Sequence, residues 1–148
     1  MIKEDLVEEM LRILISRLEE NTVALERSHE SMTGESKSSA GDKFETTRAI
    51  LQSEQDRIKS QIIQNKADIS IVKRLNLITH DKVQIGSLVS TEDGMCYFLS
   101  IGLGKLKIAD TTYYAISPSS PIGQQLIGKR EGDNLTFNQM HKTIASIK

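Results

Sequence analysis

Two acidic residues in the first half of the chain have types and a spacing that could do chemistry. Asp42 and Glu45 lie in the segment Gly41-Asp42-Lys43-Phe44-Glu45, and residues three apart share one face of a helix. Carboxylates presented together can help to hold a divalent cation. The same spacing suits a helix cap, in which Asp42 accepts from a backbone amide, Glu45 reaches back, and both favour the positive end of the helix dipole. The two interpretations are compatible, because a capping carboxylate can still present its outer oxygen.

The other motifs give little support for an enzyme that works alone. His29, His80 and His141 are far apart, and none has a partner at zinc-ligand spacing. The segment Gly102-Leu103-Gly104-Lys105 is followed by Leu rather than Ser or Thr, so it lacks the pattern of a phosphate loop. No Gly-x-Ser-x-Gly occurs. We therefore expect the chain to be no enzyme by itself and to bind no cofactor stably when alone.

Composition narrows the class of protein further. The chain has 148 residues, with 19 basic and 20 acidic side chains, and aromatic residues make up only 4%. This length excludes a large multidomain enzyme, and the balanced charge gives no broad surface for nucleic acid. There is no apolar run of membrane-spanning length and no basic leader followed by an apolar stretch. The single cysteine, Cys96, lies among apolar residues and is expected to be a buried thiol. Together these features predict a cytoplasmic protein.

Residues 1–75 have the periodicity of two amphipathic helices. The segment lacks proline, and its two glycines lie in a polar tract over residues 28–41 that favours a turn. Neither helix can bury its apolar stripe alone, so we expect an antiparallel coiled-coil hairpin with an acidic tip near residues 41–45. Gln55 and Asn65 interrupt the second stripe and would suit a seam either within one chain or between chains. The seam positions of the second helix recur at spacings of three and four: Leu51, Gln55, Ile58, Ile62, Asn65, Ile69 and Val72.

Residues 76–148 show strand-like runs separated by turn residues, which predict a small antiparallel sheet. Ser120 and Pro121 have the pattern of a helix cap and first helical position, and Gly128 that of a helix stop. The expected fold class is therefore α+β, with a helical hairpin followed by a compact sheet domain. The strand-like runs are 82–91, 95–101, 105–109, 113–116, 135–137 and 143–147.

The segment from Ser120 to Asp133 carries a more specific signature. It contains Ser-Pro-Ile at 120–122, Leu-Ile-Gly-Lys at 126–129 and Gly-Asp at 132–133. Together with Gly41, Asp42 and Glu45, this signature resembles the Gre family of bacterial transcript cleavage factors, the transcription elongation factors GreA and GreB. The resemblance covers nearly the whole chain. It implies a long antiparallel coiled-coil hairpin followed by a small FKBP-like domain.

The resemblance also implies a partner and a function. The hairpin would enter the secondary channel of RNA polymerase, and the second domain would dock at the rim of that channel. In a backtracked complex, Asp42 and Glu45 would help the polymerase to hold a second Mg²⁺ and to position the attacking water, so that the nascent RNA is cleaved. The factor would act as a monomer and contact the RNA only indirectly. Lys129 and Arg130 are candidate docking charges, and the alternative is that they are solvated turn residues.

Two alternatives follow from departures at the tip and from the heptads. Lys43 and Phe44 stand where the family usually has an aliphatic residue and then a lysine. Because Gre-like relatives exist that occupy the same channel and inhibit or modulate the polymerase, a non-catalytic channel-binding regulator is one alternative. The other is a coiled-coil adaptor, in which the heptads serve self-association.

Overall fold

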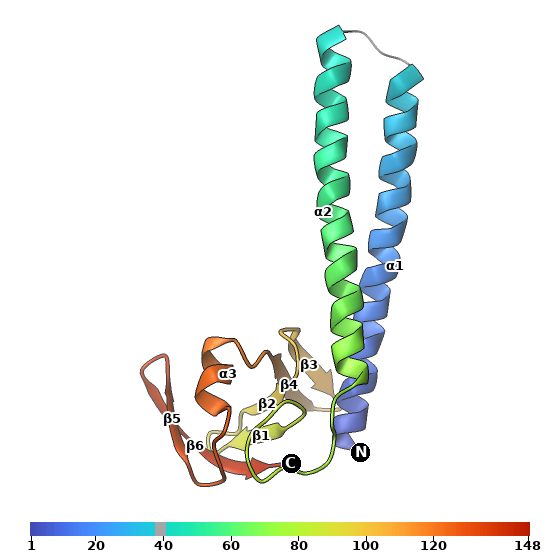
Figure 1. Cartoon of the computed structure of the whole chain (residues 1–148). Coiled ribbons are helices and arrows are strands. Elements are labelled where there is room, and N and C mark those ends of the chain that lie inside the picture. Colours follow the sequence, from blue (N-terminus) through green and yellow to red (C-terminus); the bar gives the residue numbers. More distant parts are fainter. Residues whose placement is uncertain (38–40) are drawn as a thin grey trace. The chain divides into compact units, whose positions relative to one another are not determined.

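Two long helices make up the N-terminal half of the chain. A computed structural model describes the backbone of residues 1–37 and 41–148 and the side chains of residues 1–33 and 45–148. α1 spans Ile2–Lys37 and α2 spans Gly41–Lys73 (Figure 1). The prediction of two helices is therefore confirmed.

The predicted turn over residues 28–41 is wrong for its first ten residues, because α1 continues to Lys37. Serine disfavours a helix only weakly. Thr33 satisfies its hydroxyl on the helix itself, since Oγ1 donates to the carbonyl of His29 at 3.0 Å. Residues 38–40 of the predicted turn lie outside the described residues.

By compactness the chain divides into two units. One consists of Met1–Leu11 together with Ser70–Lys148, and the other is Arg12–Ile69. The division cuts both long helices, and each unit is described by itself below. The predicted domains, residues 1–75 and 76–148, follow the secondary structure instead and stay a prediction.

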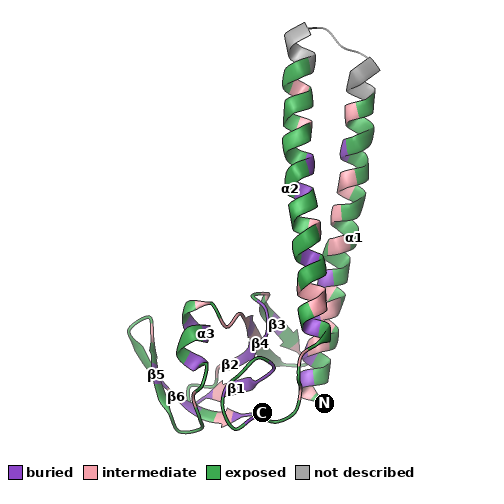
Figure 2. Cartoon of the chain, viewed as in Figure 1, coloured by how far each residue is buried: buried purple, intermediate pink, exposed green. Residues whose placement is uncertain are grey.

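The unit Arg12–Ile69 is an antiparallel pair of helix segments with a mostly aliphatic seam. Asn21 Nδ2 donates to Asn65 Oδ1 at 2.8 Å, and Gln55 Nε2 lies 3.9 Å from Met32 Sδ. Later positions of α1 thus meet earlier positions of α2, and both polar interruptions find their contacts within one chain. Figure 2 shows buried and half-buried residues along the sides of α1 and α2 that face each other. Every predicted seam position of α2 is buried or half-buried.

The other unit contains a six-stranded sheet in the order β3-β4-β2-β1-β6-β5. Four of the neighbouring pairs are antiparallel, as predicted, whereas β2 and β4 are parallel. The sheet is therefore mixed, because β3 lies outside β4 rather than between β4 and β2. The fold class, α+β, is confirmed. The strands are β1 Leu88–Thr91, β2 Cys96–Leu99, β3 Gly104–Ile108, β4 Thr111–Ile116, β5 Asn134–Phe137 and β6 Met140–Ile147.

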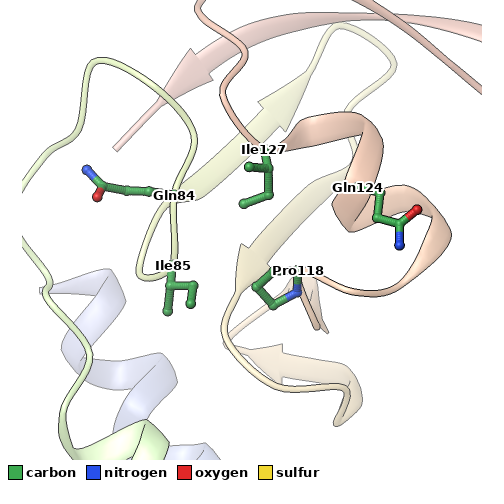
Figure 3. Close-up of a pocket in the computed structure, with 5 residues that line it drawn as sticks. All are labelled: Gln84, Ile85, Pro118, Gln124 and Ile127. Atoms are coloured by element: carbon green, nitrogen blue, oxygen red, sulfur yellow. The ribbon is translucent and has the colours of Figure 1, made fainter.

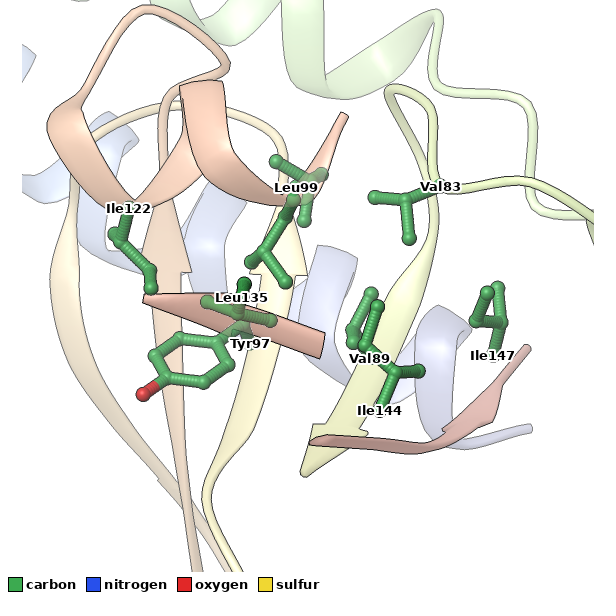
Figure 4. Packing of buried hydrophobic residues seen from close by; sticks show 9 residues of the cluster. Val83, Val89, Tyr97, Leu99, Ile122, Leu135, Ile144 and Ile147 are labelled. Carbon is green, nitrogen blue, oxygen red and sulfur yellow. The ribbon is translucent and has the colours of Figure 1, made fainter. Parts of the chain in front are cut away.

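The core of this unit is largely aliphatic, as the composition requires. The short helix α3, Pro121–Leu126, contributes Ile122 and Leu126 to it. Cys96, expected to be buried, is half-buried; it is the first residue of β2, and the three residues that follow it in the strand are buried. The core cluster, eight members of which are labelled in Figure 4, comprises Val83, Val89, Tyr97, Leu99, Ile122, Leu126, Leu135, Ile144 and Ile147.

The first three turns of α1 belong to the same compact unit as the sheet. Leu6 and Met10 are fully buried. Ser100 Oγ lies 3.8 Å from Met10 Sδ, and Lys3 Nζ donates to the carbonyl of Ile78 at 2.9 Å. The start of the chain is therefore fixed to the sheet unit by packing and by a hydrogen bond.

Candidate functional site: the hairpin tip and the C-terminal signature

The candidate acids lie at the start of α2. The helix begins at Gly41, so Asp42 is its second residue and Glu45 its fifth. The side chain of Glu45 is exposed, whereas that of Asp42 lies outside the described residues. Negative charges in a first turn stabilise a helix through its dipole. The spacing predicts that both acids share one helical face. This prediction and the capping and cation-binding interpretations stay predictions.

Among the residues that the structure describes, no three His, Cys, Asp or Glu side chains gather closely enough to hold a metal ion. Within the same described residues, no helix is long and apolar enough to cross a membrane.

The Ser-Pro-Ile part of the signature builds the start of α3. Ser120 Oγ accepts from the amide of Gly123 at 3.1 Å, and Pro121 occupies the first turn, as predicted. A Cβ on Gly123 would lie 2.1 Å from the carbonyl oxygen of Ser117. Glycine is required there because the helix passes so close to the preceding backbone.

The Gly-Lys part of the signature ties the end of α3 to the loop before β1. Gly128 adopts a φ of +81°, and its amide donates to the carbonyl of Val83 at 2.9 Å. The amide of Val83 in turn donates to the carbonyl of Lys129 at 2.9 Å. These reciprocal bonds join two loops that are about 45 residues apart in the chain.

The Gly-Asp part of the signature forms a turn that leads into β5. Asp133 Oδ2 accepts from the amide of Arg130 at 2.8 Å, and the amide of Gly132 donates to the carbonyl of Ile144 at 2.9 Å. The aspartate is thus a turn residue. Lys129 is half-buried and Arg130 is exposed. Of the two candidate docking charges, Arg130 therefore presents the more accessible side chain.

An apolar groove beside the signature was missed in the sequence. It has a volume of about 580 Å³ and is lined by Gln84, Ile85, Pro118, Gln124 and Ile127 (Figure 3). Ile127 is 42% exposed, since α3 ends at Leu126 and the chain turns away. Ile85 is 49% exposed. The signal for this groove in the sequence was Ile85, a large aliphatic residue next to Gly86. The structure places it in a loop.

A buried pair of basic side chains was also missed. His80 is buried, and its Nδ1 lies 2.7 Å from Ser87 Oγ, while Nε2 finds no partner among the described residues. Burial lowers the pKa of Lys3. Burial, followed by the charge of Lys3, lowers the pKa of His80. The two residues are 77 positions apart, so no sequence pattern could reveal the pair.

The comparison with known protein families agrees with the signature. Residues 78–148 match the sequence model of the family described as "Transcription elongation factor, GreA/GreB, C-term". None of the curated proteins is significantly similar in sequence. Among solved structures, the chain is similar to one titled "Structure of the transcription factor Gfh1", with 22% identity over 94% of this chain and 93% of that chain and a TM-score of 0.37. The signature, α3 and the whole sheet lie within residues 78–148. These residues are therefore a transcription elongation factor domain of the GreA/GreB C-terminal type, which makes up just under half of the chain.

Proposed function

We propose that the chain binds RNA polymerase through its secondary channel and stimulates endonucleolytic cleavage of the nascent RNA in backtracked complexes. The observation that carries the proposal is the combination, in one chain, of a GreA/GreB C-terminal domain with an antiparallel helical hairpin whose second helix starts Gly-Asp-x-x-Glu. The polymerase supplies the catalytic centre, and the factor is not itself the enzyme.

The chemistry explains why two carboxylates are needed at the tip. Cleavage of a phosphodiester by two metal ions requires stabilisation of both the attacking and the leaving oxygen. A second Mg²⁺ that the polymerase holds weakly gains affinity when further carboxylate oxygens are brought to it, because Mg²⁺ prefers such ligands. In this proposal Asp42 and Glu45 supply those oxygens, and Mg²⁺ is shared with the polymerase.

The C-terminal domain supplies the docking surface in the same proposal. Lys129 and Arg130 directly follow Ile127 and Gly128, so the candidate charges are next in sequence to the apolar groove. An exposed apolar groove with neighbouring cations suits a protein partner better than it suits bare nucleic acid.

A transcript cleavage assay on stalled, backtracked elongation complexes tests the function. Asp42→Ala with Glu45→Ala is expected to abolish stimulation while the protein still binds polymerase. The matched control is Glu26→Ala with Glu30→Ala, which removes two exposed acids of α1 and is expected to leave stimulation unchanged. Equal cleavage by the tip variant and the unmodified protein would contradict the assignment of Asp42 and Glu45.

The second candidate is a channel-binding regulator without cleavage activity. Lys43 and Phe44, which replace the usual residues between the acids, favour it. It predicts slower elongation and no cleavage in the same assay. Stimulated cleavage at modest Mg²⁺ would eliminate this candidate.

A further inference from the structure

A hydrogen bond between two side-chain amides crosses the hairpin seam. Asn21 Nδ2 and Asn65 Oδ1 are 2.8 Å apart, and only 9% of Asn65 is exposed. We propose that Asn21 and Asn65 are positioning residues that fix the register of α1 against α2, and thereby keep Asp42 and Glu45 in the first turns of α2. The effect on the acids rests on the proposed function, whereas the register itself does not.

The aliphatic part of the seam does not set the register by itself. The seam has similar aliphatic side chains at Leu18, Leu25 and Ile62. A slip of seven residues therefore replaces one aliphatic contact with another. Packing alone therefore leaves slipped hairpins close in free energy to the observed one. A polar pair is the usual means by which a coiled coil excludes them.

The amide pair supplies that selectivity. A slip of seven residues sets Asn21 against Ile58 or Val72, and it sets Asn65 against Leu14 in one direction and Ser28 in the other, so the two amides lose their mutual hydrogen bond. Each amide that then faces an aliphatic side chain stays desolvated and disfavours the slipped state by about tenfold or more. The contact between Gln55 and Met32 has nearly the same register. Met32 lies eleven residues after Asn21 in α1, and Gln55 lies ten residues before Asn65 in α2.

A slip would first change the structure at the tip of the hairpin. One heptad corresponds to about 10 Å of sliding along a helix. Three residues stand between Lys37 and Gly41, and the four steps that join these two Cα atoms reach no more than about 14 Å when fully extended. The same reach must also cross the distance of about 8–10 Å between two packed helix axes. The slip must therefore be absorbed by unwinding helical residues at the ends of α1 and α2. Asp42 is the second residue of α2 and would be among the first to leave the helix.

Disulfide trapping in the full chain tests the register without polymerase. In a Cys96→Ser background, Met32→Cys with Gln55→Cys reports the observed register. Met32→Cys with Ile62→Cys, and Met32→Cys with Arg48→Cys, report slips of seven residues in the two directions. Each pair is oxidised in the presence and absence of Asn21→Leu with Asn65→Leu, and the intrachain cross-linked fraction is measured.

The expected result is specific to the amide pair. The cross-linked fraction of the two cysteine pairs that report a slip should be at least about tenfold larger with Asn21→Leu and Asn65→Leu than with the two asparagines. Thermal stability should rise at the same time, since leucines pack well in a seam. Ser28→Ala is the matched control: it removes a buried hydroxyl that has no partner among the described residues and leaves the amides in place. Equal closure of the slipped pairs in the asparagine and leucine backgrounds, or an equal rise with Ser28→Ala, would overturn the proposal.

The consequence for function is measured in a separate transcript cleavage assay. With Asn21→Leu and Asn65→Leu, the rate of transcript cleavage at saturating factor should fall at least severalfold, while the affinity for polymerase is retained. An unchanged rate beside increased slipping would overturn the link to the acids. If the unmodified protein stimulates no cleavage, the proposed function fails, and the cross-linking result on the register still stands.

Discussion

The ammonium group of Lys3 donates a hydrogen bond to the carbonyl of Ile78, 2.9 Å away and two residues before the buried His80. This bond connects the first turn of α1 to the segment that precedes the sheet. It also places a positive charge close enough to His80 to lower the pKa of that imidazole, in addition to the effect of burial.

The first prediction concerns pH. The pKa of His80 is lowered in the folded state, so below about 6.5, its ordinary value, the unfolded chain takes up the proton more readily. The contribution to stability is complete above that pH and is lost as the pH falls. The free energy of unfolding, measured by urea titration between pH 8 and pH 5, should therefore decrease with acidification.

The matched variants separate this effect from other titrations. The free energy of unfolding of His80→Gln should decrease less between pH 8 and pH 5 than that of the unmodified chain. His141→Gln, which changes an exposed histidine, should behave like the unmodified chain. An identical pH dependence in His80→Gln and the unmodified chain would show that His80 is not the titrating group.

The second prediction concerns the ion pair between Lys142 and Asp93. The Lys142 side chain is 7% exposed, and its ammonium lies 6.0 Å from the centre of the Tyr97 ring. Asp93→Asn leaves this buried cation without its countercharge and should cost about 1–3 kcal/mol of unfolding free energy at pH 7. Adding Lys142→Met should recover part of that loss, because no charge is then buried alone. A cost below about 0.5 kcal/mol for Asp93→Asn would contradict the importance of the pair.

The same pair makes a prediction for acid pH. The hydrogen bond from Lys142 is the main reason why the pKa of Asp93 falls from 3.8 to about 2. A lowered carboxyl pKa contributes stability above 3.8 that is lost as the pH falls towards 2. The free energy of unfolding of Asp93→Asn should therefore depend less on pH between pH 4 and pH 2 than that of the unmodified chain.

The third prediction concerns Gly123. An added methyl group would lie 2.1 Å from the Ser117 carbonyl oxygen, so Gly123→Ala should destabilise the domain by about 1–3 kcal/mol. Gly102 is the control, because a Cβ there meets nothing within 4 Å. Gly102→Ala should be neutral or slightly stabilising in the same thermal melt. Equal melting temperatures for the two variants would contradict the close approach at α3.

These cases show what the sequence could and could not predict. The helices and the start of α3 follow from periodicity and from capping residues that are close in sequence, such as Ser120 and Pro121. The parallel pairing of β2 with β4 depends on contacts between distant segments, and no local pattern specifies it. The Asp42 and Glu45 spacing is equally local and could be found. Only the Ile85 side of the groove left a signal in the sequence, because Ile127 has the residue type of a core position and is exposed only through the direction of the chain after α3.

The fourth prediction concerns docking. Ile127→Glu places a charge in the apolar groove and should weaken binding to RNA polymerase at least tenfold, with little change in melting temperature because the side chain is partly exposed. Met140→Glu is the control, since Met140 is 58% exposed and does not line the groove. Binding can be measured by fluorescence anisotropy of the labelled factor. Equal affinities for the two variants would exclude the groove as a polymerase contact.

The measurement that tests the central claim most directly is the Mg²⁺ dependence of transcript cleavage in backtracked complexes. If the tip acids help to hold the second metal ion, the unmodified protein should lower the Mg²⁺ concentration needed for half-maximal cleavage severalfold. Asp42→Asn with Glu45→Gln, which keeps the shapes and removes the charges, should return that concentration to its value without the factor. The same Mg²⁺ requirement for this variant and the unmodified protein would contradict the account.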